Sequence, residues 1–91
     1  MKIKSLPPED RPRERLIKHG PKILTNSELL AIVLRTGNKK ENAINLSNKI
    51  FNKYNLKKLS RIEFSELKKI LGIGEVKASQ IIACFELARR L

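Results

Sequence analysis

Apolar residues recur at helical spacing along most of the chain, and no segment alternates polar and apolar residues as a strand would. The spacing predicts a short helix over residues 12–17, which begins at a proline and is ended by Gly20-Pro21. Thr25 and Glu28 have the spacing of a capping box, so we expect a second helix to begin there and to end at Gly37. Because that helix is apolar almost all round, we expect it to lie at the centre of the core.

A third helix is predicted from about Glu41 to Tyr54, with apolar and small residues on one face and lysines on the other. Leu56, Leu59 and Ile62 follow as anchors of a short turn. With a further pair of helices after this turn, the pattern predicts an all-α fold, a compact bundle of about five helices.

The segment 67–87 is the most informative part of the chain, because Gly72 and Gly74 interrupt a helical pattern that resumes at Glu75. The apolar positions of the two predicted helices are Leu67, Ile70 and Leu71 before the glycines, and Ala78, Ile81, Ile82 and Phe85 after them. The sequence therefore predicts two helices joined by a tight hairpin.

Two glycines separated by one apolar residue allow positive φ and a close approach of the backbone to another molecule. We therefore expect the amides of Gly72, Ile73 and Gly74, and those of the first turn of the second helix, to point outward, beside the positive end of that helix's dipole. Such an anion site suits a phosphate, and Lys77 lies in the first turn of the helix. The alternative is that the glycines only cap a helix and that Ile73 fills the core.

The chain is strongly basic, with 20 Lys and Arg against 9 Asp and Glu, a net charge of +11 and a pI near 10.2. This balance favours a polyanionic partner, although a lysine-rich surface also keeps a small domain in solution. We expect Lys68 and Lys69 near the hairpin, and Lys39 and Lys40 in the loop before the third helix, to give wider electrostatic support. Aromatic residues are too few for base-stacking platforms.

Residues 27–32 and 65–70 are similar, and the helical spacing that follows each is also similar, which indicates a faint internal repeat. Chance similarity between two amphipathic helix pairs is the alternative. We predict one helical domain over residues 1–91, divided into an arm and short helix (1–22), a degenerate first half (23–54) and a second half (55–91).

The hairpin, Gly72-Ile73-Gly74 followed by Lys77-Ala78, resembles the helix-hairpin-helix motif of DNA-repair and recombination proteins. That motif grips a DNA backbone largely without regard to sequence. Three more blocks, residues 11–16, 24–37 and 86–90, extend the resemblance from about Leu6 to the last residue. In order and spacing these blocks resemble the N-terminal region of the RadC-like family.

This resemblance implies a tandem helix-hairpin-helix arrangement, of the RuvA domain 2-like type, and an association with DNA repair. Members of that family also carry a following domain related to the JAB/MPN metal-dependent isopeptidases, to which nothing in these 91 residues corresponds. No metal or peptidase residue is therefore carried over to this chain.

The residues themselves give no case for an enzyme. Helix-hairpin-helix glycosylases place a catalytic Asp downstream of the hairpin, whereas Asp10 is the only Asp here and lies upstream. His19 and Cys84 are single residues, and we expect Cys84 to be a packed thiol within the last helix. We predict no catalytic residue, metal, cofactor or small-molecule ligand. Without a signal peptide or a long apolar run, the chain is expected to be cytoplasmic and to have no membrane contact.

The sequence thus predicts a module that binds duplex or branched DNA through its backbone. The alternative is a protein-interaction module that docks on, or regulates, the JAB/MPN-type domain of the family. An exposed apolar patch around Leu16 and Ile17, or near Leu91, would favour that alternative.

Overall fold

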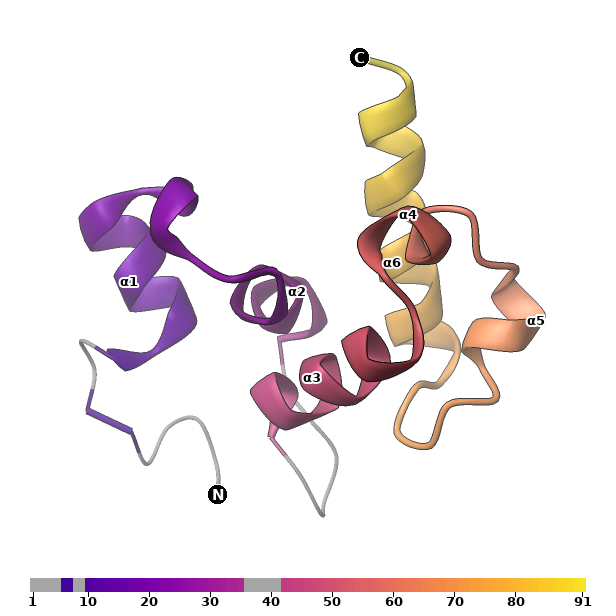
Figure 1. Ribbon diagram of the computed structural model, residues 1–91, viewed down its shortest axis with the longest axis horizontal. Coiled ribbons are helices and arrows are strands. Elements are labelled where there is room, and N and C mark those ends of the chain that lie inside the picture. The colour runs from indigo at the N-terminus through magenta and orange to yellow at the C-terminus, as the bar shows by residue number, and fades with distance from the viewer. Residues whose placement is uncertain (1–5, 8–9, 36–41) are drawn as a thin grey trace.

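The computed structural model describes residues 6–7, 10–35 and 42–91. Within them every regular element is a helix, which confirms the all-α class (Figure 1). About five helices were expected, and the described residues form six α-helices and one 3-10 helix. The two additional elements are the short segments 21–23 and 56–59, which are also helical. In chain order the elements are α1 (Pro12–His19), η3 (Pro21–Ile23), α2 (Asn26–Leu34), α3 (Ala43–Lys53), α4 (Leu56–Leu59), α5 (Phe64–Leu67) and α6 (Glu75–Arg89).

Side chains cap the starts of three helices and fix their boundaries. The Thr25 hydroxyl accepts from the Glu28 N–H, and the Glu28 carboxylate accepts from the Thr25 N–H, each at 3.1 Å, so the predicted capping box of α2 is present. Asn42 caps α3 by accepting from the Asn45 N–H at 2.8 Å, and Asn55 caps α4 in the same way.

The connection between α2 and α3 is only partly described by the structure. α2 ends at Leu34, and Arg35 follows it with a positive φ of 69°. Gly37, the predicted end of this helix, and Glu41, the predicted start of the next, lie outside the described residues.

The core is formed by α2 to α6 and by the connection between α5 and α6. As predicted, α2 is central, because it packs against α1, α3 and α6. The internal repeat between the two halves stays a prediction. The buried cluster consists of Leu30, Leu34, Leu46, Ile50, Leu59, Leu67, Ile70, Ile73, Ala78 and Ile81.

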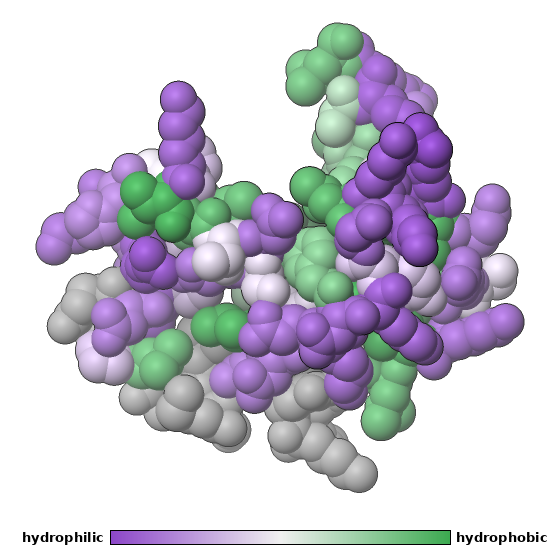
Figure 2. Space-filling view, viewed as in Figure 1, coloured by the Kyte–Doolittle hydropathy of each residue, from purple (hydrophilic) through white to green (hydrophobic). Residues whose placement is uncertain are grey.

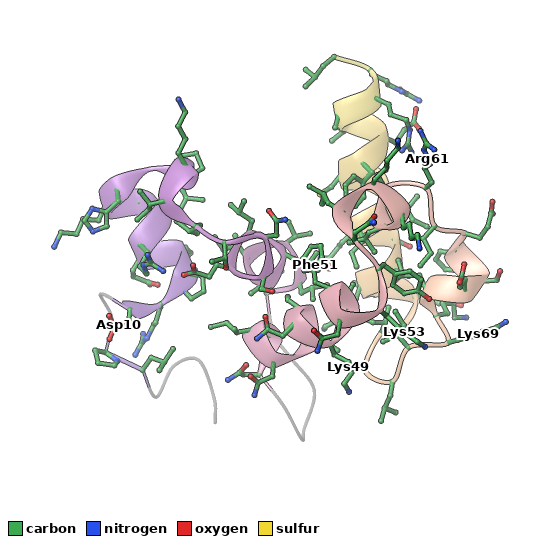
Figure 3. All side chains as sticks on the ribbon, viewed as in Figure 1. Asp10, Lys49, Phe51, Lys53, Arg61 and Lys69 are labelled. Carbon is green, nitrogen blue, oxygen red and sulfur yellow. The ribbon has the colours of Figure 1, made fainter. Side chains whose placement is uncertain are left out.

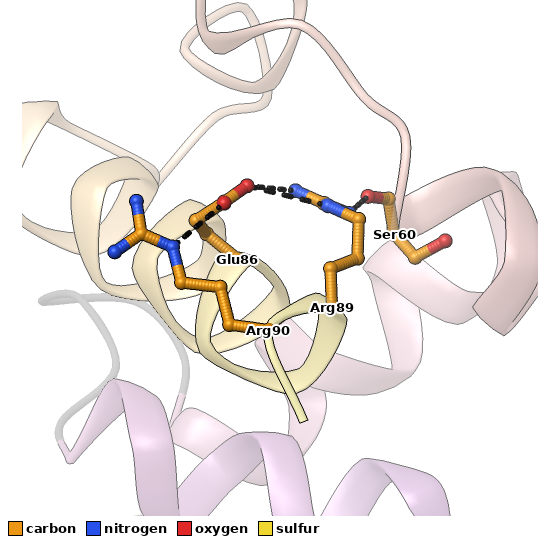
Figure 4. Close-up of polar contacts among 4 residues, drawn as sticks. All are labelled: Ser60, Glu86, Arg89 and Arg90. Atoms are coloured by element: carbon orange, nitrogen blue, oxygen red, sulfur yellow. Dashed lines mark hydrogen bonds and ion pairs between the residues drawn. The ribbon is translucent and has the colours of Figure 1, made fainter.

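The last helix, α6, reaches beyond the rest of the molecule at its C-terminal end (Figure 1). Arg89 ties this end to the turn after α4, because its guanidinium donates to the Ser60 carbonyl at 2.6 Å. Glu86 pairs with both Arg89 and Arg90, at 3.2 and 3.1 Å (Figure 4). Cys84 is exposed on α6, so the expectation of a packed thiol is wrong. The buried residues of α6 are instead Ala78 and Ile81.

No helix among the described residues is both long and apolar enough to span a bilayer.

The first helix is joined to α2 by an ion pair between Arg15 and Glu28. Burial opposes ionisation of the Glu28 carboxyl, but the N–H of Thr25 and the Arg15 guanidinium outweigh it, so the pKa of Glu28 is lowered from 4.5. A carboxylate with a lowered pKa adds stability above its unfolded-state pKa, and this stability is lost as the pH falls through the folded-state value. Glu28 is therefore a pH-dependent link between α1 and α2.

We expect Glu28→Gln to lower the free energy of unfolding at pH 7 by about 1–2 kcal/mol, because glutamine keeps the capping box but loses the charge that holds Arg15. The difference from the wild type should shrink as the pH falls below 4.5 and Glu28 becomes protonated. Urea unfolding over a series of pH values measures this, and a deficit that stays constant as the pH falls would contradict the account.

Candidate nucleic-acid interface

The spacing of Leu67, Ile70 and Leu71 predicted a helix that continues up to the glycines, but the chain between α5 and α6 is not helical. α5 ends at Leu67, and tight turns follow, in which Ile70 donates to the Leu67 carbonyl at 3.2 Å and Ile73 to the Ile70 carbonyl at 3.0 Å. These three-residue steps turn Ile70 and Ile73 into the core, whereas Leu71 is 72% exposed. The predicted helix through Leu71 is therefore wrong. The turns bury Ile70 and expose its neighbour Leu71, whereas the predicted helix would have buried both.

The two glycines of the hairpin have different conformations. Gly72 has a φ of 95°, which only glycine adopts without strain, and it reverses the chain before Ile73. The Ile73 side chain is 4% exposed, and its N–H donates to the Ile70 carbonyl. We expected this amide to point outward, and that expectation is wrong. Gly74 has a φ of −96°, is exposed, and has open space where a Cβ would lie.

Gly74 begins α6 without a capping side chain. The first bond of the helix runs from the Ala78 N–H to the Gly74 carbonyl at 3.0 Å. The N–H groups of Glu75, Val76 and Lys77 precede that bond and have no acceptor within the helix. Because α6 has 15 residues, its dipole places a partial positive charge at this exposed end. The arrangement can accept an anion from solvent.

Two of the predicted lysines lie beside this end, with different partners. Lys77 is half-buried in the first turn of α6. Lys68 lies 3.6 Å from the Glu75 carboxylate and 5.6 Å from the centre of the Phe64 ring. Lys68 is therefore held towards the start of α6, while Glu75 offsets part of its charge.

Lys69, the third predicted lysine of this half, lies with Lys53 of α3 around one shallow depression. Figure 3 shows Lys49, Lys53 and Lys69 along one edge of the molecule, and Figure 2 shows hydrophilic side chains covering this part of the surface. The complete lining of the depression is Lys53, Tyr54, Glu63, Ser65, Glu66 and Lys69. Helical spacing places Lys53 among the outward-facing lysines of the third helix, but this spacing did not predict Lys53 as a site residue.

Tyr54 fixes one acidic wall of the depression, because its hydroxyl donates to the Glu66 carboxylate at 3.2 Å. Desolvation and then the neighbouring Glu66 charge raise the pKa of the Tyr54 hydroxyl, which therefore stays protonated and keeps donating. The lysine spacing on α3 was visible in the sequence, but its approach to Lys69 depends on how α3 packs against the α5 region. Lys39 and Lys40, also predicted for the site, lie outside the described residues.

A family model described as UPF0758 N-terminal matches residues 3–79 of the chain. The chain belongs to the UPF0758 family. Over 91 residues it is 58% identical to a UPF0758 protein of Methanococcoides burtonii and 55% identical to one of Methanosarcina barkeri, each comparison covering the whole of this chain. A UPF0758 protein of Clostridium acetobutylicum is 52% identical, and that comparison covers 99% of this chain.

The chain spans 40% of the length of each of these curated relatives. No solved structure matches it. Among the described residues, this UPF0758 domain thus brings together the start of α6, Lys68 and Lys77, with Lys53 and Lys69 around a depression of their own.

The different conformations of the two glycines predict different responses to a side chain. Gly72→Ala should lower the free energy of unfolding by about 1–2 kcal/mol, because alanine is strained at positive φ. Gly74→Ser is the matched control and should leave stability unchanged or raise it by about 0.5 kcal/mol, because serine is a good N-cap residue and its Cβ meets open space. Chemical unfolding of both variants checks this, and equal losses would contradict the hairpin geometry.

Proposed function

We propose that this UPF0758 N-terminal domain binds the DNA backbone without sequence specificity, with one phosphate at the start of α6. The observation that carries the proposal is the exposed and uncapped helix end at Gly74, directly after the reversal at Gly72. Unsatisfied N–H groups and the helix dipole both favour a phosphate at such an end. Because these donors are backbone groups, they carry no information about the base sequence.

The surrounding charges support a DNA partner, although they are mixed in sign. Lys53, Lys68, Lys69 and Lys77 outnumber the carboxylates of Glu63, Glu66 and Glu75 around the hairpin and the depression. The whole chain has a net charge of +11, so the long-range field attracts a polyanion. Lysines act on phosphates as mobile point charges, whereas the helix end gives a fixed direction.

The resemblance to the RadC-like family supports the same proposal and adds the helix-hairpin-helix interpretation and a role in DNA repair. We treat the domain as a binding module for duplex or branched DNA and assign it no catalytic residue. Gly74 and the amides of residues 75–77 are the proposed backbone donors, and Ile73 acts as the core anchor of the hairpin rather than as a donor.

Gly74→Asp tests the hairpin directly. The new carboxylate would bind the free N–H groups at the start of α6 and repel a phosphate, so we expect the affinity for duplex DNA to fall at least tenfold at low salt. Gly74→Asn is the matched control, because it has the same shape and the same capping ability but no charge. Its affinity should fall less. Fluorescence anisotropy with a labelled duplex measures both, and wild-type affinity for Gly74→Asp in a folded protein would refute the assignment.

Lys53 and Lys69 can be tested through the salt dependence of binding. If each neutralises one phosphate, the double change Lys53→Gln and Lys69→Gln should reduce the slope of log K against log salt by about 1–2. Lys18→Gln with Lys22→Gln removes the same charge from α1 and η3 and should leave the slope within experimental error. Equal slopes for the two double variants would show that only net charge matters.

A second candidate function is contact with another protein segment, in particular the remaining part of the longer UPF0758 proteins, which the resemblance identifies with a JAB/MPN-type domain. Exposed apolar residues favour it: Ile17 on α1 is 74% exposed, and Leu91 is fully exposed. Leu16, expected in the same patch as Ile17, is only half-exposed. This contact is compatible with DNA binding at the opposite end of α6.

A further inference from the structure

The last helix is apolar on two opposite faces. One face carries Ala78, Ile81 and Phe85, which belong to the core or pack against it. The other face carries Val76, Ala83 and Leu87, with Gln80 between Val76 and Ala83. Leu91 follows two residues after the helix ends at Arg89. Val76 is 72% exposed, Leu87 is 68% exposed, and Ala83 and Leu91 are also exposed. We call Val76, Ala83, Leu87 and Leu91 the α6 stripe.

An apolar line of this kind is unusual on a free helix. A surface helix normally has one apolar face towards the core and polar residues opposite, and a helix that is apolar on both sides is normally covered on both. The charged residues near the end of α6 are paired with one another, because Glu86 pairs with Arg89 and Arg90 (Figure 4). In Figure 2, hydrophobic surface stands at the projecting end of α6, apart from the body of the molecule. The α6 stripe is therefore suited to a partner.

We infer that the α6 stripe is a docking surface for the part of the longer UPF0758 protein that follows this domain. Two observations favour this occupant over a second copy of the chain. The matching family model describes an N-terminal domain and the relatives are about two and a half times as long, so in a relative the remaining part would follow the segment that corresponds to α6. In addition, four small or medium side chains fall short of the roughly 800 Å² per partner that a standard interface between separate proteins buries.

A tethered segment does not need an interface as large as one between separate proteins. A segment joined within a few residues of Leu91 is held at an effective concentration in the millimolar range, so a small apolar contact is enough to keep it docked. Docking along Leu87 and Leu91 would leave the start of α6 free, because Val76 and Leu87 are about 17 Å apart along a helix axis. The inference rests on the second candidate function above and is independent of the proposed DNA contact.

The test compares two proteins by hydrogen exchange of the amides of residues 83–91. One is the 91-residue chain, and the other is the same chain continued after Leu91 by the remainder of the Methanococcoides burtonii relative. We expect exchange in this segment to be at least tenfold slower in the longer protein, at every protein concentration. Leu87→Lys, and separately Ala83→Glu, should abolish the difference. Leu71→Lys, which changes an equally exposed leucine outside the stripe, should preserve it.

The amides of residues 78–82, in the middle of α6, report whether each variant is folded. Equal exchange in the two wild-type proteins would overturn the inference. Slower exchange with rising concentration in the 91-residue chain alone would also overturn it, because the occupant would then be a second copy. DNA affinity of the 91-residue chain should not change on Leu87→Lys, so failure of the docking inference and failure of the DNA proposal are separately visible.

Discussion

The burial of Ile73 is the constraint on which the rest of the second half depends. Its side chain lies in the core cluster while the chain reverses on either side of it, and this requires the positive φ of Gly72. With Ile73 fixed inside, Gly74 emerges at the surface and α6 begins there with its first amides unused. The same burial therefore closes the core and leaves exposed the amides at which we propose that a phosphate binds.

The two ends of α6 follow from this anchoring. At its start, the free amides lie beside Lys68 and Lys77, and Glu75 offsets part of their charge, so we expect moderate and salt-sensitive affinity for a phosphate backbone. At its far end the helix is held by the bond from Arg89 to Ser60, while an apolar face opposite the core stays exposed. One helix is thus suited to two partners, a polyanion at the start and an apolar surface near the end.

Local patterns predicted much of this structure. The capping box of Thr25 and Glu28 and the start of α6 could be predicted because each depends on neighbours in sequence. The central position of α2 could be predicted because a helix that is apolar almost all round must be covered on every side. The early end of α5 and the exposure of Leu71 were not, since they depend on which of two adjacent apolar residues the core accepts. Nor could spacing show that Lys53 and Lys69 line the same depression, because their placement depends on tertiary packing.

The most direct test of the central claim is a titration of the isotope-labelled chain with a short DNA duplex, followed by the amide resonances in two-dimensional NMR at low and high salt. The account predicts that the largest shifts occur at Gly74 and residues 75–77, with smaller ones around Lys53 and Lys69, and that all reverse as salt is raised. Shifts absent from the start of α6, or spread evenly over all the lysines, would contradict it.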